Sequence, residues 1–302
     1  MSLNKHSHSM NPEIFLTGSN GFVGSYLTKY WEKSYKILPY KREDNITISS
    51  PYTIHLAGIA HDVKNATTDT RLSREVNVEL TKKVFDAFLQ SDSSEVFIFL
   101  SSIKAVVDSP LKQVLESDVP QPIGIYGISK LEAEQYILSK QLPVGKRVYI
   151  LRPALIHGPN NKGNLALLQK FINTKIPWPF AAFHNQRSYC SIQNLTFIIE
   201  QLLMDREIPS EIYHIADDDS ISTNQLIGIM AKAQGKHARY LPISEKWIIG
   251  MAKLGDRLRL PFNTEKLNKL TGSFIVSNEK IKNAMGKHLP FSCEQGFLQN
   301  LK

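Results

Sequence analysis

Three residues of this 302-residue chain have the types and spacing needed for acid–base chemistry on an alcohol or a carbonyl. Tyr126 and Lys130 are four residues apart, so on a helix they share one face. A free tyrosine has a pKa of about 10, and a nearby ammonium lowers that pKa because it stabilises the phenolate. Ser102 lies 24 residues before Tyr126, after a predicted strand, where its hydroxyl can polarise a carbonyl. We predict that Ser102, Tyr126 and Lys130 move a proton to or from a substrate oxygen.

A glycine-rich turn near the N-terminus is typical of dinucleotide binding. Gly18, Gly21 and Gly24 follow a predicted strand over residues 13–17 and open a predicted helix over residues 25–33. Glycine at these positions permits a tight turn and close approach of the backbone to a pyrophosphate, which the helix N-terminus then binds. The alternative is a purely structural turn. The predicted cofactor contacts from this turn are Gly18, Asn20, Gly21, Phe22, Val23 and Gly24.

The end of the second predicted strand, residues 36–40, indicates which dinucleotide is bound. An acid at this place hydrogen-bonds the ribose of NAD, whereas a basic side chain accommodates the 2′-phosphate of NADP. The chain has Lys41 and Arg42 here. The sequence therefore favours NADP(H), with NAD(H) as the alternative because Glu43 and Asp44 follow immediately.

The elements that must position these residues alternate between strand and helix. After the first two strands, further strands are predicted over residues 52–57, 95–100 and 147–151, with helices over residues 73–89 and 129–139. This alternation predicts an α/β fold, a Rossmann-like doubly wound parallel sheet. Beyond Pro159 the pattern loosens to helices over 197–203 and 247–260 and a short strand over 212–215. We expect a smaller mixed α/β C-terminal substrate lobe there.

These patterns divide the chain into predicted domains. Residues 1–11 are a flexible tail, and residues 12–160 form the dinucleotide-binding Rossmann domain, to which residues 189–218 return. Residues 161–188 and 219–302 form the substrate-binding lobe.

Composition narrows the function classes further. With 42% hydrophobic residues the chain can bury a core, which excludes a wholly disordered protein. The N-terminus has no apolar segment of a signal peptide, and there is no apolar run of spanning length, so we expect a cytoplasmic protein. Two cysteines and scattered histidines predict no metal site. The net charge of +8 is spread along the chain, so we expect no nucleic-acid partner and no stable membrane association.

Taken together, six motifs resemble the extended short-chain dehydrogenases/reductases, in the NAD-dependent epimerase/dehydratase family that acts on nucleotide sugars. They occur in family order within residues 12–203: TGSNGFVG at 17–24, IHLAG at 54–58, VNV at 76–78, FLSSIK at 99–104, YGISK at 126–130 and LRPALIHGP at 151–159.

The resemblance implies roles for individual residues. Ser102, Tyr126 and Lys130 are then the catalytic triad, and Asn77 supports the active site. Leu56, Ala57, Gly58, Asn77, Tyr126, Lys130 and Pro153 join the turn residues as cofactor contacts, and His61, Lys104, Asn164, Phe180 and Arg187 are substrate contacts. The resemblance also implies a homodimer formed through the helices that carry Tyr126 and Asn77.

Two segments depart from the family pattern. Only nine residues, Glu43 to Pro51, separate Arg42 from Tyr52, where the family has another strand and helix that contact adenine. Ala105 to Asp108 replaces a family glycine after Lys104, so the loop over the sugar differs.

The leading hypothesis is an NADPH-dependent 4-ketoreductase acting on a UDP-linked 4-keto-6-deoxy sugar in bacterial surface-polysaccharide synthesis. The alternative is a UDP-hexose or UDP-N-acetylhexosamine 4-epimerase that retains NAD. A 4,6-dehydratase is disfavoured because Ile103 and Lys104 replace its Asp-Glu pair. A non-catalytic dinucleotide sensor is a minor alternative, because such proteins often lose the Tyr or Lys that this chain keeps.

Overall fold

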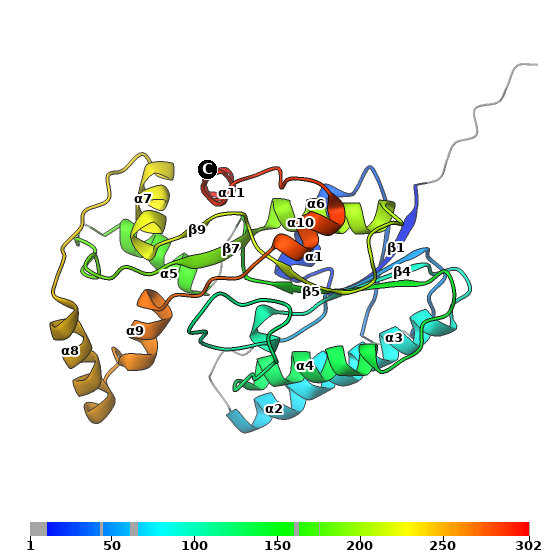
Figure 1. The fold of residues 1–302 in the computed structure, drawn as a ribbon, viewed down its shortest axis with the longest axis horizontal. Helices are drawn as coiled ribbons and strands as arrows, with labels where there is room; N and C mark the ends of the chain where they lie inside the picture. The colour runs from blue at the N-terminus through cyan, green and yellow to red at the C-terminus, as the bar shows by residue number, and fades with distance from the viewer. Residues whose placement is uncertain (1–10, 43–44, 61–65, 160–162, 175, 302) are drawn as a thin grey trace, which may run out of the picture. The chain divides into compact units, whose positions relative to one another are not determined.

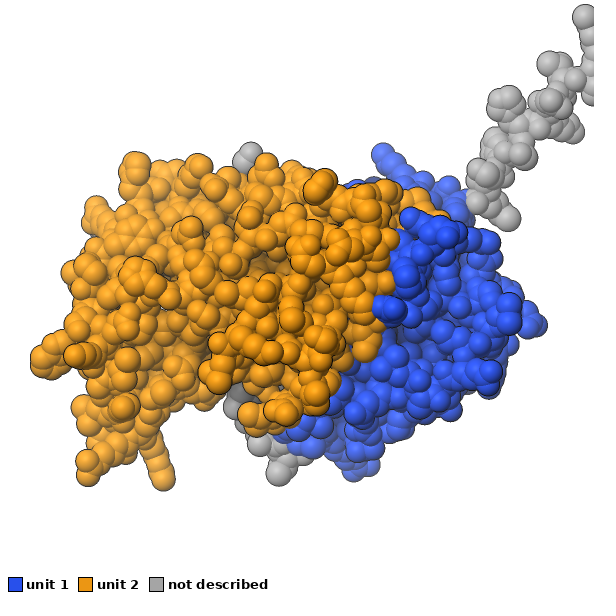
Figure 2. All heavy atoms as spheres, viewed as in Figure 1, with its two compact units in different colours: residues 1–101, 124–151, 205–211 blue, residues 102–123, 152–204, 212–302 orange. Residues whose placement is uncertain are grey.

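The computed structural model describes residues 11–42, 45–60, 66–159, 163–174 and 176–301. The chain forms two compact units, coloured separately in Figure 2. The first comprises residues 1–101, 124–151 and 205–211, and the second comprises residues 102–123, 152–204 and 212–302. The chain passes between the units several times, so each unit is assembled from distant parts of the sequence.

Parallel strands form the centre of the first unit. They are β1 (Glu13–Thr17), β2 (Lys36–Pro39), β3 (Tyr52–His55), β4 (Val96–Leu100) and β5 (Arg147–Pro153). With β8 (Ile212–Ile215) they give a six-stranded sheet in the order β2-β1-β3-β4-β5-β8 (Figure 1). All five residues of β4 are buried, as expected for a parallel sheet covered on both faces. The predicted Rossmann-like doubly wound sheet is confirmed.

The helices of the first unit begin earlier than the sequence predicts. They are α1 (Phe22–Tyr30), α2 (Ala66–Arg74), α3 (Leu80–Gln90) and α4 (Ile125–Leu138). A π-helical turn over Glu75–Glu79 joins α2 to α3. The prediction of one helix over 73–89 missed most of α2 and did not distinguish this turn, because α2 is mostly polar and has only two apolar residues, Ala66 and Leu72.

Aromatic side chains and one lysine hold the first unit together below the sheet. The Phe85 and Phe88 rings contact Phe97 of β4 with centroid distances of 4.9 and 5.2 Å. Lys146, just before β5, donates to the carbonyl oxygens of residues 88, 91 and 94 at 2.8, 2.6 and 2.7 Å. Its ammonium thereby fixes the segment that leads from α3 into β4.

The second unit is mixed and includes a three-stranded sheet. The order is β6 (Leu155–His157), β7 (Arg187–Ser191) and β9 (Ser220–Ile221), with β6 parallel and β9 antiparallel to β7. Its helical segments are the 3₁₀ turn η2 (Ile103–Ala105), α5 (Gly163–Ile172), α6 (Ile192–Met204), α7 (Thr223–Ala233), α8 (Glu245–Leu258), α9 (Thr264–Thr271), α10 (Glu279–Met285) and α11 (Cys293–Asn300). A mixed α/β composition beyond the Rossmann strands matches the sequence prediction.

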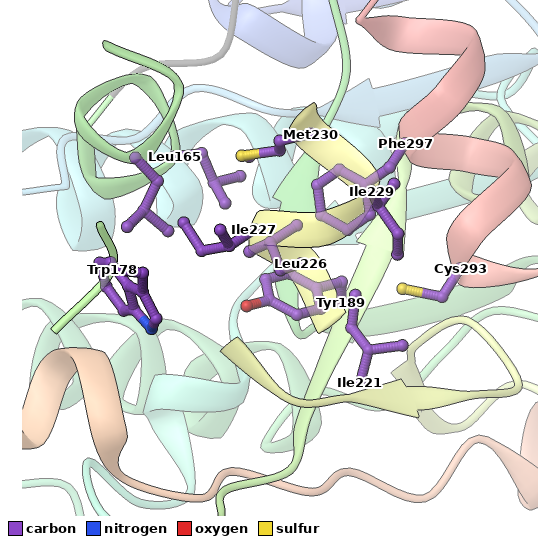
Figure 3. Close-up of a cluster of buried hydrophobic side chains, with 11 residues drawn as sticks. Leu165, Trp178, Tyr189, Ile221, Leu226, Ile227, Ile229, Met230, Cys293 and Phe297 are labelled. Carbon is purple, nitrogen blue, oxygen red and sulfur yellow. The ribbon is translucent and has the colours of Figure 1, made fainter. Parts of the chain in front are cut away.

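A hydrophobic cluster anchors β7 to the helices around it (Figure 3). It gathers Tyr189 of β7, Leu226 and Met230 of α7, and Cys293 and Phe297 of α11. The two helices α7 and α11 begin with complete capping boxes at Ser222 and Ser292, which define where each helix starts.

Among the residues that the structure describes, no helix combines the length and apolar composition needed to cross a bilayer.

We predict that Lys146→Met lowers the free energy of unfolding by about 2 kcal/mol, because three carbonyl oxygens lose a charged donor and regain only partial solvation. Chemical denaturation measures this change. The matched control is Lys83→Met, which removes an exposed lysine of α3 and should change stability by less than about 0.5 kcal/mol. Equal stability of the two variants would contradict the structural role of Lys146.

Candidate active site

The glycine turn folds back tightly against the end of β3. Gly18 has a φ of +71°, and a Cβ there would lie 2.7 Å from the Ala57 nitrogen. At Gly24 a Cβ would lie 2.1 Å from the Gly18 carbonyl oxygen. A larger residue at Gly18 would collide with the segment after β3, and one at Gly24 would force α1 away from the turn, so both glycines are required by packing.

The N-terminus of α1 is suited to binding an anion. Gly21 caps the helix with no side-chain hydrogen bond, and the first turn contains no acid. Gly21 and Asn20 are exposed, Phe22 is half-buried and Val23 is buried. Backbone N–H groups at a helix start carry partial positive charge. With the close-packed glycines, these features fit the pyrophosphate of a dinucleotide.

A chain of buried polar groups runs beneath this turn. Thr17 Oγ1 accepts from the Ala57 N–H at 3.1 Å and lies 2.6 Å from His55 Nδ1. His55 Nε2 lies 2.9 Å from Thr81 Oγ1, which itself donates to the Asn77 carbonyl oxygen. Because Thr81 has only one hydrogen, it must accept from His55. The imidazole therefore carries its proton on Nε2 and accepts from the Thr17 hydroxyl at Nδ1.

His55 is neutral in this arrangement. Its side chain is fully buried, and burial lowers the pKa of His55 to about 3, with a further contribution from the charge of Lys130. A neutral imidazole with one donor and one acceptor nitrogen satisfies both threonines. His55 therefore links β1 and β3 to the helix that carries Asn77.

Asn77 lies at the centre of the π-helical turn and connects three segments. Its Oδ1 accepts from the Ile59 N–H at 2.8 Å, and its Nδ2 lies 3.1 Å from the Ile59 oxygen. The same amide donates to Ser129 Oγ of α4 at 2.9 Å and to Ser73 Oγ at 3.1 Å. The predicted supporting role of Asn77 thus has a geometric basis: it ties the loop after Gly58 to the helix of Tyr126 and Lys130.

Lys130 is a buried cation, 2% exposed. Its Nζ donates to the Leu100 carbonyl oxygen at 2.9 Å and lies 4.6 Å from the Phe99 ring centroid. A Cβ on Gly58 would approach this nitrogen to 3.1 Å. Burial lowers the pKa of Lys130 to about 8, and the nearby Glu134 carboxylate works in the opposite direction. The side chain is therefore mostly charged at neutral pH but close to releasing its proton.

Glu134 is a second buried ionisable group on α4. It is fully buried and accepts a hydrogen bond from Ser101 Oγ, directly after β4. α4 is thereby fastened to the carboxyl end of β4 by two contacts, Lys130 to Leu100 and Ser101 to Glu134.

Tyr126 lies in the first turn of α4, one turn before Lys130, and is half-buried. Its carbonyl oxygen accepts from Ser129 Oγ at 2.9 Å. The hydrogen bonds of Ser129 therefore connect the backbone of Tyr126 to Asn77. The helical geometry predicted for the Tyr126–Lys130 pair is observed.

The two basic residues after β2 are exposed at the edge of the first unit. Arg42 Nη2 pairs with Glu75 Oε1 at 2.7 Å, and both side chains are more than half exposed. An exposed pair of this kind contributes little stability, so it can be exchanged for a phosphate. Lys41 also lies here, whereas Glu43 and Asp44 fall outside the described residues.

The second unit contains Ser102 and the predicted substrate residues Lys104 and Arg187. Ser102 precedes the 3₁₀ turn, and its Oγ accepts from the Lys104 N–H at 3.2 Å. Lys104 Nζ donates to the Asp108 oxygen at 2.6 Å and lies 5.1 Å from the Phe274 ring centroid. Burial lowers the pKa of Lys104; Asp108 opposes this effect, while Arg187 adds to it. The charge of Arg187 therefore acts on the Lys104 ammonium.

Arg187 begins β7 and is half-buried. Its Nη1 donates to the Lys269 and Gly272 oxygens, at 2.7 and 3.3 Å, at the C-terminal end of α9. These bonds orient the guanidinium while using one of its nitrogens. The predicted diphosphate contact therefore depends on the rest of the group.

The remaining predicted contacts are distributed over both units. Phe180 is half-buried, and its ring packs between Trp178 and Phe262 at centroid distances of 4.9 and 6.0 Å. Asn164 lies in the first turn of α5, and Pro153 is buried at the end of β5. Leu56 and Ala57 are half-buried after β3, whereas His61 lies outside the described residues.

Sequence reasoning missed His55, Thr17, Thr81, Ser129 and Glu134. Two signals were available: a histidine in an otherwise apolar strand, and an acid four residues after Lys130 on the same helix face. The polar character of buried Thr81 and Ser129 becomes meaningful only once the helices are packed.

One group of three potential metal ligands occurs among the described residues: His157, Asp217 and Cys293. Asp217 already accepts from the Ser191 N–H and from Asn194 Nδ2. Burial raises the pKa of the Cys293 thiol, so the sulfur stays protonated and is a poor ligand. These contacts indicate a structural hydrogen-bonded cluster.

Comparisons with known proteins agree on one family. The model of the NAD dependent epimerase/dehydratase family matches residues 14–216. The chain is 30% identical to a UDP-glucose 4-epimerase of Vibrio cholerae, with 96% of this chain and 94% of that protein covered. It is 28% identical to a GDP-6-deoxy-D-mannose reductase of Pseudomonas aeruginosa, over 52% of this chain and 57% of that protein.

A solved structure shares the fold. The dTDP-4-dehydrorhamnose reductase of Bacillus anthracis in complex with NADP superposes with a TM-score of 0.74 at 17% identity, covering 97% of this chain and 99% of that chain.

We predict that Lys130→Met abolishes activity, with at least a 100-fold loss, yet does not lower stability at pH 7. The folded-state pKa of about 8 lies below the unfolded value of 10.5. Below pH 8 both states bind the proton, and the buried charge costs about 3 kcal/mol. Between pH 8 and 10.5 only the unfolded chain holds the proton, so wild-type stability rises with pH.

Denaturation at pH 7 and pH 10 measures both parts of this prediction. The stability difference between Lys130→Met and wild type should favour the variant at pH 7 and shrink by pH 10. Lys146→Met is the matched control, since it should be less stable than wild type at both values. A Lys130→Met protein less stable than wild type at pH 7 would contradict the predicted net cost of the buried charge.

Proposed function

The chain belongs to the NAD dependent epimerase/dehydratase family, and from this premise we propose that it is a UDP-sugar 4-epimerase that retains NAD through its catalytic cycle. The observation that carries the proposal is the first unit's combination of a glycine-lined turn with Tyr126 and the buried cation Lys130 on one helix. This combination supports proton and hydride exchange at a secondary alcohol. The broader class, nucleotide-sugar epimerases and reductases, includes the relatives of this chain.

The glycine turn and the start of α1 would hold the pyrophosphate of the dinucleotide. Leu56, Ala57, Gly58 and Pro153 would border the cofactor, and Lys130 would bind the nicotinamide ribose. When bound, the nicotinamide ring accepts hydride from the sugar carbon and returns it. The role of the chain itself is therefore to hold the sugar and to move the hydroxyl proton.

Tyr126 is the proton acceptor in this proposal. As C4 of the sugar loses its hydride, the Tyr126 phenolate takes the proton of the C4 hydroxyl, and the sugar becomes a 4-ketone. The Lys130 ammonium favours the phenolate electrostatically. The 4-keto sugar would then rotate within the site to present its opposite face. Tyr126 would return the proton to the C4 oxygen as hydride returns to that face of C4. Substrate and product then have the same redox state.

Ser102 follows the two residues that contact α4. Ser101 is hydrogen-bonded to Glu134 of α4, and Leu100 accepts from Lys130. Ser102 is the next residue, and consecutive Cα atoms are about 3.8 Å apart. In this proposal the Ser102 hydroxyl would donate a hydrogen bond to the C4 oxygen.

The choice of epimerase over reductase follows from the extent of the similarities. The Vibrio cholerae 4-epimerase aligns with 96% of this chain, whereas the Pseudomonas aeruginosa reductase aligns with 52%. The UDP moiety would contact the second unit, where Lys104 and Arg187 provide positive charge for a diphosphate. Asn164, Phe180 and His61 are further proposed substrate contacts.

A second candidate, the NADPH-dependent 4-ketoreductase, is favoured by one observation. Lys41 and Arg42 lie directly after β2, where a 2′-phosphate is bound in folds of this kind. We treat the cofactor as the point that separates the two candidates.

The first experiment denatures the purified full chain and identifies the released nucleotide by mass spectrometry. For an epimerase we expect retained NAD, and conversion of UDP-glucose or UDP-N-acetylglucosamine into its C4 epimer without added cofactor. Deuterium placed at C4 should remain in the product. The matched variant Tyr126→Phe should lose at least about 100-fold in rate while keeping the nucleotide. NADPH oxidation with a 4-keto UDP-sugar, and no epimer from any UDP-sugar, would select the reductase.

Arg42→Ala separates the candidates independently. If NADPH is the cofactor, loss of a charged phosphate contact should raise its KM about tenfold or more and leave the KM for NADH unchanged. For a 4-epimerase with NAD we expect no effect, since the Arg42 side chain would keep its exposed ion pair with Glu75. Arg206→Ala is the control, because Arg206 also forms an exposed ion pair, with Glu95, on the same unit.

A further inference from the structure

Helix α8 leaves an apolar stripe in solvent. Its side chains Trp247, Met251, Leu254 and Leu258 are 75%, 55%, 53% and 58% exposed. Their spacing of four, three and four residues puts them on one helix face. Residues 246, 247, 250, 251 and 254 line a surface hollow of about 440 Å³. A contiguous exposed apolar face of this kind marks an interaction surface.

The exposed stripe belongs to a firmly packed helix. Ile248 and Ala252, on a different face, are buried against Leu267 of α9. A Cβ on Gly255 would lie 1.9 Å from the Phe262 oxygen, so the helix C-terminus packs closely on the chain that follows it. α8 is therefore held by one apolar face and presents another to solvent.

Positive charge borders the exposed stripe. Lys246, Lys253 and Arg257 are spaced seven and four residues apart and form a basic stripe beside it. The two acids of α8 lie on the far side of the helix. Asp256 accepts from the Thr264 N–H at 3.2 Å, and Glu245 lies in the first turn. The exposed part of α8 thus combines apolar and cationic side chains without an acid between them.

We propose that α8 binds reversibly to the surface of a bilayer that contains anionic phospholipid. The apolar stripe enters the boundary between headgroups and acyl chains, with Trp247 at the interface, and the basic stripe contacts the phosphates. A second copy of the chain is a poorer occupant, because a two-fold interface would place two positively charged patches against each other. This proposal is independent of the reaction proposed above.

The proposal refines the sequence-based expectation of no stable membrane association. A single helix with four exposed apolar side chains provides a weak anchor, so binding should depend on lipid charge and on salt. From the sequence, the basic segment Lys253 to Arg259 gave only weak support for a membrane-surface role. The exposed apolar stripe was not identified, since helical periodicity does not reveal which apolar stripe is packed inward.

Vesicle sedimentation of the full chain tests the proposal. We expect binding to phosphatidylcholine vesicles that contain phosphatidylglycerol, at least about tenfold weaker binding to pure phosphatidylcholine, and a similar loss on raising salt. Tryptophan emission gives a site-specific signal. Of the three tryptophans, Trp31 and Trp178 are buried, so a blue shift on adding vesicles reports Trp247 and should vanish in Trp247→Phe.

Paired variants locate the surface. Met251→Ser with Leu254→Ser should weaken vesicle binding at least about tenfold, whereas the control Leu111→Ser with Val144→Ser, at two fully exposed apolar sites elsewhere, should not. Circular dichroism verifies that each variant is folded, and the Trp247 shift does not depend on the paired variants. The proposal is overturned by absent binding, by equal salt-independent binding to neutral vesicles, or by sedimentation velocity showing that the Met251/Leu254 pair instead breaks a dimer.

Discussion

The buried ammonium of Lys130 is the interaction on which the first unit's site depends. A charge taken out of water costs several kcal/mol unless neighbouring groups compensate for its lost hydration. Here the compensation comes from the Leu100 oxygen, the Phe99 ring and the nearby Glu134 carboxylate. These groups belong to β4 and α4. The contacts that keep Lys130 charged therefore also join β4 to α4, the helix that carries the proposed acid–base residue Tyr126. Function and local stability act in opposite directions at this residue.

The remaining polar groups convert this local arrangement into a rigid frame. Thr17 accepts a hydrogen bond from the Ala57 N–H, which lies against the glycine turn. His55 connects Thr17 to Thr81 of α3. Asn77, in the π-helical turn before α3, donates to Ser129 of α4. Each hydrogen-bond donor around His55 has one acceptor, so the tautomer with its proton on Nε2 satisfies both threonines. The glycine turn and the helix of Tyr126 and Lys130 are therefore connected by hydrogen bonds in the interior. A displacement of one would also displace the other.

The parts that the sequence predicted are those whose chemistry is local. Gly18 is required by its φ of +71°, Gly24 is required by its contact with Gly18 in the same turn, and Tyr126 and Lys130 share a face through helical spacing alone. His55, Thr81 and Glu134 could not be assigned in this way, since each acts through a partner from 26 to 33 residues away in the chain. The start of α2 was missed for a different reason, because this helix is mostly polar and has only two apolar residues, Ala66 and Leu72.

The second unit also contains an interaction between distant residues that the sequence did not predict, here between two charged side chains. Burial lowers the pKa of Lys104, and the charge of Arg187, 83 residues away in the sequence, adds to this effect while Asp108 opposes it. Such a pair is costly unless an anion is shared between them. The α9 carbonyl oxygens hold one nitrogen of Arg187. The guanidinium is therefore already oriented when an anionic ligand binds. A diphosphate that contacts both side chains would offset their repulsion, which is the electrostatic basis of the proposed nucleotide-sugar substrate.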